Sequence, residues 1–292
     1  MIYTVTLNPA LDYIMDIGKL DFGKTNRSRC ETIYPGGKGI NVSIVLSRLG
    51  CESCAWGFLG GFTGAKLRNS LEEIGCKQDF VLLSNEETRI NVKLRGQTET
   101  EINAIGPKIS AEDMKNLLEK FEVLNSRDTL VLAGSIPMNC DKNCYEEMLR
   151  IAVKADAKCV VDTCGEPLLR TLSYRPFLIK PNLQELSEVL NRNIETQSEI
   201  FAAAQELQKI GARNVMVSCG KDGAYLFTQR ESFFAAPPRG TLVNSVGAGD
   251  SMVAGFLADY EKYNDYESAL KFAVKVGSAT AYSDWLATPE ML

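Results

Sequence analysis

Histidine is absent from the 292 residues of the chain. Its absence excludes histidine-based catalytic triads, zinc sites with histidine ligands and the His-Arg-Asp loop of protein kinases. Acid–base chemistry in this protein must therefore rely on carboxylates.

Targeting and membrane-spanning segments are missing as well. The N-terminal residues Met1–Val5 lack the basic and apolar regions of a signal peptide, and no apolar run reaches the ~18 residues that a membrane span needs. The formal net charge is −5, from 32 Lys and Arg against 37 Asp and Glu, which gives no positive surface for nucleic acid or an anionic membrane. We therefore expect a cytoplasmic protein with small-molecule partners.

Cysteine is present nine times, an odd number scattered through apolar and mixed surroundings. In a chain of this kind we expect reduced cysteines in the core rather than disulfides. Cys51 and Cys54 have the spacing of a redox or zinc site, but no second pair lies at metal-ligand distance, so a structural role is favoured. With 45% apolar and 24% charged residues, the composition indicates a folded globular protein with a sizeable core.

Strand-like and helix-like segments alternate along most of the chain. Continuous apolar runs bounded by turns are typical of strands that are buried on both faces of a parallel sheet. The sequence therefore predicts an α/β fold with a doubly wound, mostly parallel sheet flanked by helices. The predicted strands are 3–7, 55–59, 129–133, 159–162, 177–179 and 215–218, and the predicted helices include 40–49, 63–74 and 110–124.

Two stretches, at about 12–34 and 88–104, interrupt this alternation. Within them the segments 13–17, 25–33, 88–94 and 100–104 are strand-like with no helix between them. No linker, low-complexity tract or fixed-period repeat divides the chain. We therefore expect a single domain over 1–292, in which the extra strands form a small β-sheet lid.

A glycine-rich motif in the C-terminal third, Gly247-Ala248-Gly249-Asp250, precedes an apolar, helix-compatible segment. Glycines before a helix leave several backbone N–H groups pointing into one space, which the helix dipole makes attractive to anions. A phosphoryl group in transfer is such an anion, and the aspartate can accept a proton from an attacking hydroxyl. A plain helix start with an acidic first turn explains the motif equally well.

A second glycine cluster, Gly36-Gly37-Lys38-Gly39-Ile40-Asn41, opens another helix near the N-terminus. It is neither a Walker A loop nor a Gly-x-Gly-x-x-Gly fingerprint, because the required spacings are missing. A functional interpretation is close approach of the backbone to a small polar ligand, with Lys38 and Asn41 as polar contacts. A tight turn between strand and helix is the competing interpretation.

Three further segments carry polar groups at strand or helix ends. Asn182 and Glu185 lie three residues apart at a helix start, where they offer oxygen atoms to a hydrated magnesium ion or simply cap the helix. The loop Ser218-Cys-Gly-Lys-Asp-Gly223 follows a buried strand, as a nucleotide-binding loop or a hairpin turn would. Asp12 lies just past the first strand, where open α/β sheets bind ligands.

Together these residues resemble the PfkB (ribokinase-like) carbohydrate kinases over essentially the whole chain. Both signatures of that family are present in order, and jointly they are far more specific than either alone. Within the family, the similarity is greatest to members that phosphorylate fructose 1-phosphate, with those acting on tagatose 6-phosphate as close sisters. The strings that carry this finer similarity are Thr6–Tyr13, Thr25–Arg27, Gly60–Gly64, Thr88–Lys93 and Glu99–Asn103.

The resemblance implies a role for each matching residue in an ATP- and Mg²⁺-dependent sugar-phosphate kinase. Asp250 matches the catalytic base, and the amides of Gly247, Ala248 and Gly249 match the anion hole. The resemblance also implies a homodimer formed through the lid. The remaining matches are Asp12, Gly37, Lys38 and Asn41 for the sugar hydroxyls; Arg27, Arg89 and Asn91 for the phosphate on the sugar; Asn182 and Glu185 for magnesium through water; and Lys180, Asn182, Ser218, Gly220, Gly223 and Gly249 for ATP.

Two departures from the family pattern are visible. Many members carry an Asp-Thr pair before the C-terminal signature, where this chain has Asn244-Ser245-Val246, which counts against a monovalent-cation site. The chain also ends at Leu292, slightly short of the terminal helix that the family leads us to expect.

Other functions stay open at this point. A catalytically idle nucleotide- or sugar-binding regulator can share the fold, because fold does not dictate function. An NAD-dependent dehydrogenase is disfavoured by the missing dinucleotide fingerprint.

Overall fold

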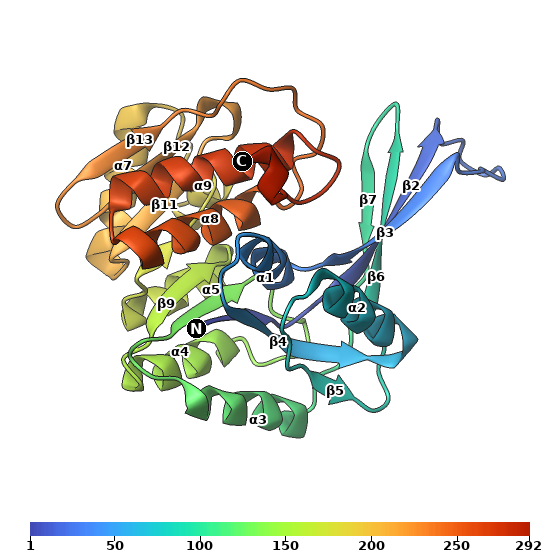
Figure 1. Cartoon of the computed structure of the whole chain (residues 1–292), viewed down its shortest axis with the longest axis horizontal. Coiled ribbons are helices and arrows are strands. Elements are labelled where there is room, and N and C mark those ends of the chain that lie inside the picture. The colour runs from blue at the N-terminus through green and yellow to red at the C-terminus, as the bar shows by residue number, and fades with distance from the viewer.

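The computed structural model describes residues 1–292 and contains two β-sheets with helices around the larger one (Figure 1). The helices are α1 (Lys38–Arg48), α2 (Gly61–Ile74), α3 (Ala111–Glu119), α4 (Cys144–Lys154), α5 (Gly165–Thr171), α6 (Leu183–Val189), α7 (Gln197–Ile210), α8 (Ala248–Tyr263) and α9 (Tyr266–Ala281). The strands are β1 (Ile2–Thr6), β2 (Ala10–Gly18), β3 (Cys30–Gly36), β4 (Ser53–Gly60), β5 (Val81–Leu83), β6 (Arg89–Gly96), β7 (Thr100–Asn103), β8 (Thr129–Ala133), β9 (Lys158–Asp162), β10 (Leu178–Ile179), β11 (Asn214–Ser218), β12 (Ala224–Phe227) and β13 (Ser232–Ala235).

The larger sheet has nine strands in the order β13-β12-β11-β10-β9-β8-β1-β4-β5. All neighbours from β5 to β11 are parallel, while β12 and β13 add antiparallel strands at one edge. The predicted doubly wound, mostly parallel sheet is therefore confirmed. The antiparallel edge strands were not predicted.

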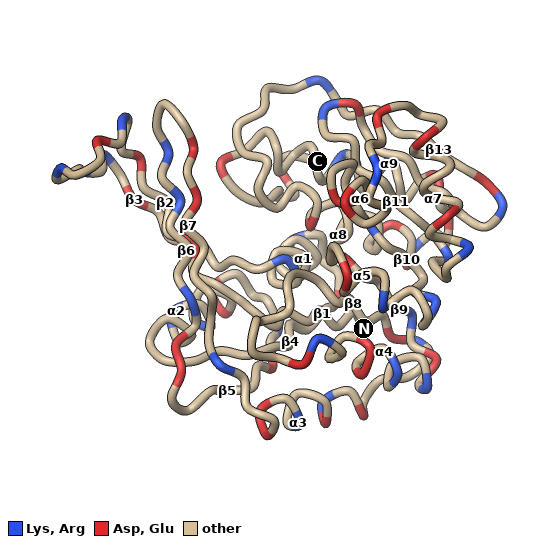
Figure 2. Tube along the Cα trace, turned by 180° about the vertical axis from the view of Figure 1, so that it is seen from behind, with Lys and Arg blue, Asp and Glu red and all other residues tan.

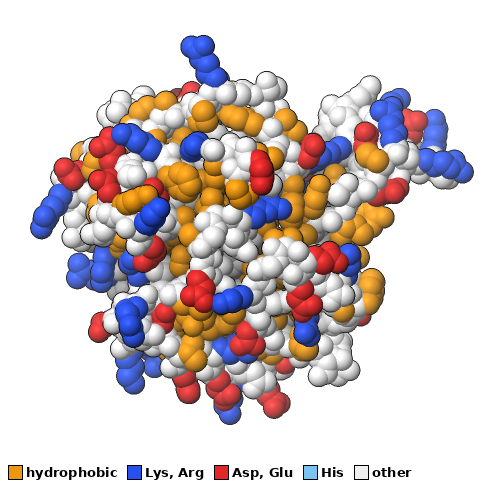
Figure 3. All heavy atoms as spheres, viewed as in Figure 1, with side chains coloured by type: hydrophobic (Ala, Val, Ile, Leu, Met, Phe, Trp, Pro, Cys, Tyr) orange, Lys and Arg blue, Asp and Glu red, His pale blue; other side chains and the backbone are white.

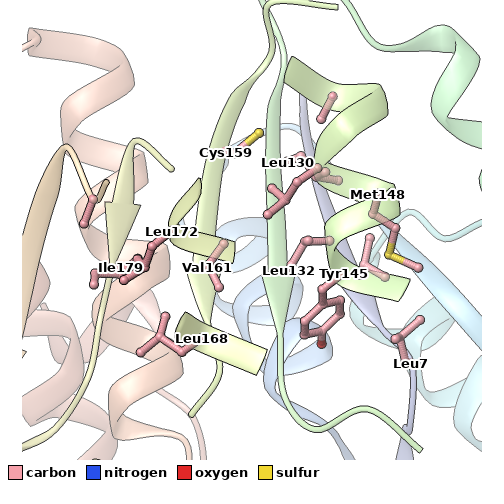
Figure 4. Close-up of a cluster of buried hydrophobic side chains, with 14 of the residues drawn as sticks. Leu7, Leu130, Leu132, Tyr145, Met148, Cys159, Val161, Leu168, Leu172 and Ile179 are labelled. Atoms are coloured by element: carbon pink, nitrogen blue, oxygen red, sulfur yellow. The ribbon is translucent and has the colours of Figure 1, made fainter. Parts of the chain in front are cut away.

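Two apolar clusters, one on each face of this sheet, form the core. Along β8, Leu130 and Leu132 belong to one cluster and Val131 and Ala133 to the other, as the two-residue period of a strand requires. Helices α3–α7 cover the first face and α1, α2, α8 and α9 the second. In Figure 4, Leu132 packs beside Tyr145 and Met148 of α4. Burial on both faces explains why these strands are uninterrupted apolar runs.

The smaller sheet, here called the lid, has the strand order β3-β2-β6-β7. It projects from the body, with Lys and Arg gathered at its free end (Figures 1 and 3). The two predicted lid stretches supply all four of its strands. One predicted strand is partly wrong, since 25–29 forms an exposed loop and β3 begins at Cys30. In that loop Asn26 bonds with the backbone of Asp21 and Lys24, which replaces strand pairing by a local polar turn.

Several predicted helix ends are confirmed by backbone geometry. Gly50 and Gly75 follow α1 and α2 with φ of 73° and 78°, in the left-handed region that glycine favours. Ser110 and Asp113 form the predicted capping box at the start of α3. The helix expected over 110–124 ends earlier, at Glu119, and continues as a 3₁₀ turn over Lys120–Val123.

Acidic and basic residues alternate over the whole trace without a large region of one sign (Figure 2). None of the helices combines the length and apolar character that crossing a membrane would take.

Candidate active site

A polar cavity of about 530 Å³ lies between the lid and the ends of the main-sheet strands. It is lined where β1, β8, β9 and β10 end, which is the carboxyl edge at which open α/β sheets bind ligands. Only three of its 24 lining residues are hydrophobic. A cavity this polar is suited to a small hydrophilic ligand.

Four buried side-chain atoms around this cavity have no hydrogen-bond partner in the protein. They are Thr6 Oγ1, Asn8 Oδ1, Arg89 Nε and Asn91 Oδ1, out of seven such atoms in the chain. Buried polar atoms are nearly always hydrogen-bonded, so four atoms without a protein partner around one cavity are an unusual concentration.

Asp250 lies in the first turn of α8, almost fully buried at one side of the cavity. Gly247 caps the helix with φ of 79°, and the side-chain amide of Asn41 donates to Asp250 Oδ2 at 2.7 Å. Gly247 and Gly249 line the cavity with Asp250. Ala248 lines the adjoining pocket, and its N–H donates to the Ser245 carbonyl.

The pKa of Asp250 is raised to about 6, chiefly by burial and then by the negative charge of Asp162. Lys38, the hydrogen bond from Asn41 and Lys180 oppose this rise. A carboxyl group with a pKa near neutrality is well matched to accepting and returning a proton. The arrangement at the start of α8 can therefore act as a general base.

Asp162, at the end of β9, was not predicted as a site residue. It is fully buried, and its Oδ1 lies 3.2 Å from Lys38 Nζ and 3.5 Å from Lys180 Nζ. Burial alone would raise its pKa, but Lys180 and Lys38 outweigh burial and hold the pKa below its usual value. Its position after a buried apolar run is the same feature that drew attention to Asp12.

Lys38 lines the same cavity as Asp12, and its Nζ lies between Asp162 and Glu185, at 3.2 and 3.4 Å. Asp162 raises the pKa of Lys38 more than burial lowers it, so this lysine stays charged. Together with Lys180 it supplies two positive charges close to Gly249 and Asp250.

Asn182 and Glu185 form a capping box at the start of α6, so the structural interpretation of this pair is correct. Asn182 Oδ1 accepts from the Glu185 N–H at 2.8 Å, and Glu185 Oε2 accepts from the Asn182 N–H at 2.9 Å. Both side chains nevertheless line the cavity. No cluster of three or more acidic or thiol ligands that could hold a metal directly is present. Asn182 and Glu185 can therefore hold a Mg²⁺ ion through water molecules, most of which the ion keeps as its ligands.

Asp12 lies at the lid side of the cavity, held by two side chains of β6. Asn91 Nδ2 donates to Asp12 Oδ1 at 3.0 Å, and Lys93 Nζ lies 3.1 Å from Asp12 Oδ2. Lys93 also lies 3.7 Å from Glu101 on β7. Lys93 and Glu101 were not predicted as site residues: the strands that carry them were assigned to the lid, but not the register that places Lys93 beside Asp12 and Glu101.

The two predicted phosphate-binding arginines are in different places. Arg89 lines the cavity, half-buried, and its guanidinium donates to the carbonyls of Ala104 and Asn8. Arg27 is exposed on the loop between β2 and β3 and is not part of the cavity lining. Within one chain, only Arg89 is positioned to contact a ligand there.

A second pocket of about 390 Å³ adjoins the first, with Asn182, Ser218 and Gly249 lining both. It contains the predicted nucleotide residues Gly220 and Gly223. Its inner wall comes from α8 and α9 and from residues beside them. Apart from Gly249, this wall was not predicted; the additional lining residues include Leu242, Met252, Val274, Gly277, Ala281 and Tyr282. A flat, largely apolar heterocycle is the kind of group that such a wall accommodates.

Comparisons with known proteins agree with this geometry. The model of the pfkB family carbohydrate kinases matches residues 5–287. A 1-phosphofructokinase of Bacillus subtilis is 47% identical over 292 residues, covering 100% of this chain and 96% of the relative. A D-tagatose-1-phosphate kinase of Bacillus licheniformis is 36% identical and covers 98% of this chain and 94% of the relative. The crystal structure of phosphofructokinase-2 from Escherichia coli in complex with fructose-6-phosphate has a TM-score of 0.93 at 28% identity, covering 99% of this chain and 96% of that one.

Proposed function

Because the chain belongs to the pfkB family of carbohydrate kinases, we propose that it transfers the γ-phosphoryl group of ATP to the C6 hydroxyl of fructose 1-phosphate. The products are fructose 1,6-bisphosphate and ADP. The 47% identity of a 1-phosphofructokinase over the full chain supports this acceptor. The single structural observation that carries the chemistry is the buried Asp250 at the start of α8, between the Asp12 side of the cavity and the second pocket.

In this proposal Asp250 accepts the proton of the C6 hydroxyl as its oxygen attacks the γ-phosphorus. The bond between the γ-phosphorus and the β,γ-bridging oxygen breaks, and ADP leaves with that electron pair. Phosphoryl transfer of this kind needs positioning and charge stabilisation rather than covalent catalysis. Asn41 orients the carboxylate through its 2.7 Å hydrogen bond.

The charge that develops on the phosphoryl oxygens meets the start of α8 and two lysines. The N–H groups of Gly247 and Gly249 lie where the helix dipole favours an anion. Lys38 and Lys180, both paired with Asp162, add positive charge on the same side. A bound Mg²⁺ ion would neutralise the phosphates, and Asn182 and Glu185 would hold it through its water ligands.

ATP and the acceptor occupy opposite parts of the joined cavities in this proposal. Ser218, Gly220 and Gly223 border the nucleotide, and the wall of α8 and α9 takes its base. Asp12, Gly37 and Asn41 bind the sugar hydroxyls, while Arg89 and Asn91 face the phosphate on C1. A phosphate beneath the lid needs a charged hydrogen-bonding partner, and arginine can hold two of its oxygens.

We further propose that the chain is one kinase domain that forms a homodimer through its lid in the cytoplasm. The lid projects from the body and exposes large apolar side chains, including Ile33, Ile90 and Ile102. Burying such a surface against a second copy is favourable. A role for the exposed Arg27 requires that a lid reach the cavity of another chain. Mixing Arg27→Ala chains with Asp250→Asn chains tests this, because shared sites would restore activity in the mixed dimer.

The alternative acceptors are tagatose 6-phosphate and, from the relative named for it, D-tagatose 1-phosphate. A non-catalytic regulator is the alternative from another class, but an Asp250 with a pKa near 6 in a glycine-rich helix start supports catalysis. One assay of ADP release separates these proposals. Turnover should be fastest with fructose 1-phosphate in a panel that includes both tagatose phosphates, fructose 6-phosphate and fructose. ADP release with none of them would contradict the proposed kinase.

A further inference from the structure

The Asp12 carboxylate, on the lid side of the cavity, is held at both of its oxygens. Each of its oxygens has one protein partner from β6: Asn91 at Oδ1 and Lys93 at Oδ2. The pairing of β2 with β6 places Asp12 opposite Asn91 and Ile14 opposite Lys93, so these side chains share one face of the lid. The next strand adds Glu101 opposite Lys93.

The contacts with Asn91 and Lys93 leave part of the hydrogen-bonding capacity of the Asp12 carboxylate unused. An ionised carboxylate has about four lone-pair positions, of which two are used here, one on each oxygen. One acceptor position therefore remains on each oxygen, and the side chain is still 16% exposed toward the cavity. This pattern fits two neighbouring hydroxyl groups on a sugar ring.

Lys93 lines the cavity as well, but little of its side chain is open to a ligand. Its side chain is only 7% exposed, and its ammonium group lies between Asp12 and Glu101. Paired on both sides, it acts on the ligand through Asp12. Fructose 1-phosphate and tagatose 1-phosphate differ only in configuration at C4, so their C3 and C4 hydroxyls are trans in one and cis in the other. A carboxylate fixed in one plane matches only one of these geometries.

We propose that Lys93 is a positioning residue that, together with Asn91, locks the Asp12 carboxylate so that the acceptor is selected by its configuration at C4. This inference rests on the proposed function, because it requires a ketose 1-phosphate acceptor. Without the contact from Lys93 the carboxylate can turn. The preferred sugar then binds more weakly, and the difference in kcat/KM between the two epimers becomes smaller.

The test compares kcat/KM for D-fructose 1-phosphate and D-tagatose 1-phosphate in the wild type, Lys93→Met and Lys93→Arg. Lys93→Met keeps the length of the side chain and removes its charge. It should lower the ratio of the two kcat/KM values roughly tenfold and raise the KM for fructose 1-phosphate, with the KM for ATP unchanged. Lys93→Arg should restore most of the ratio. Lys19→Met is the matched control, since Lys19 is an exposed lid lysine paired with Asp21.

The outcomes separate this inference from the proposed function. Failure of the wild type to phosphorylate fructose 1-phosphate contradicts the proposed function. A wild type that uses both epimers equally well, or an unchanged ratio in an active Lys93→Met enzyme, overturns the positioning role. Equal losses on both sugar phosphates, with fructose itself unaffected, would make Lys93 a phosphate ligand and also overturn it. Should Lys93→Met not fold, Asn91→Ser removes the other donor to the same carboxylate and must lower the same ratio.

Discussion

At the scale of single residues, Asp250 is the group on which the proposed chemistry depends. Asp250→Asn keeps the shape of the side chain and the contact with Asn41 but cannot accept a proton. We expect turnover to fall ~10²–10⁴-fold, the usual contribution of a general base, with little change in ATP affinity. Asp259→Asn, in the same helix and outside the cavity lining, should keep full activity. Near wild-type turnover in a folded Asp250→Asn protein would remove the base from the proposal.

The raised pKa of Asp250 also predicts the pH dependence. A base must be deprotonated, and its pKa is about 6, so kcat/KM should rise with pH and level off above that value. The protein has no histidine, so no imidazole group can cause the same rise of kcat/KM with pH. A pH–rate profile of the free enzyme checks this. A profile that is flat between pH 5 and pH 7 would show that Asp250 does not titrate in the step measured.

Arg89 is the residue that we expect to recognise the phosphate of the acceptor. Arg89→Ala should raise the KM for fructose 1-phosphate and leave the KM for ATP nearly unchanged. A charge-assisted hydrogen bond is worth ~1.5–3 kcal/mol, so kcat/KM should fall roughly 10- to 150-fold. Because Arg89 also donates to the carbonyls of Asn8 and Ala104, fructose without phosphate is the necessary comparison. If kcat/KM for fructose fell by the same factor, Arg89 would instead serve to hold the lid in place.

At the scale of elements, the start of α6 allows a controlled test of the metal proposal. Asn182 with Glu185 and Thr196 with Glu199 form the same capping box, but only the first pair lines the cavity. Glu185→Ala should raise the Mg²⁺ concentration needed for half-maximal rate, and Glu199→Ala should not. Each loses a comparable helix cap, worth ~1 kcal/mol. Titrations of both variants with Mg²⁺ are the measurement, and equal shifts would leave Glu185 with a capping role only.

The elements that the sequence predicts well are those with a local physical cause. The buried strands were found because burial on both faces demands continuous apolar runs, and the ends of α1 and α2 because glycine marks a left-handed cap. The loop at 25–29 was missed because Asn26 makes side-chain bonds that no periodicity reveals. Edge strands β12 and β13 were not predicted as strands, although a hairpin turn at 218–223, one of the two interpretations of that loop, leads into an antiparallel strand such as β12.

The same distinction applies to the candidate site. Asp12, Asn41 and Asp250 were found because each stands next to a turn or cap with a recognisable pattern. Asp162 and Lys93 were not found, because their importance comes from contacts between elements far apart in the sequence. Asp162 pairs with Lys180 and with Lys38, and Lys38 lies 124 residues away. Glu101 was missed with Lys93, the residue that it contacts. Such contacts are consequences of sheet order, which the pattern of a single chain does not contain.

At the scale of the whole molecule, the buried charge of Asp250 affects global stability. Its pKa is about 6 in the folded protein and near 3.8 when unfolded, so the folded state binds the proton more tightly. Between pH 4 and pH 6 this group therefore lowers the free energy of unfolding as pH rises. Asp250→Asn should be more stable than the wild type at pH 7.5, by roughly 2–3 kcal/mol, and about equal at pH 4. Urea unfolding at both pH values measures this, and a variant less stable at pH 7.5 contradicts it.

The pairing of β2 with β6 limits how the length of this chain can change. Side chains alternate between the faces of a strand, so one residue inserted between Arg89 and Lys93 would send either Asn91 or Lys93 away from Asp12. Insertions at the hairpin tips, 19–29 and 97–99, leave that alignment intact. Length variation is therefore tolerable at the free end of the lid and damaging near its base. The tip at 97–99 is the natural place to attach a fluorophore or to graft a loop, because the other tip carries Arg27, which is proposed to reach the cavity of a second chain.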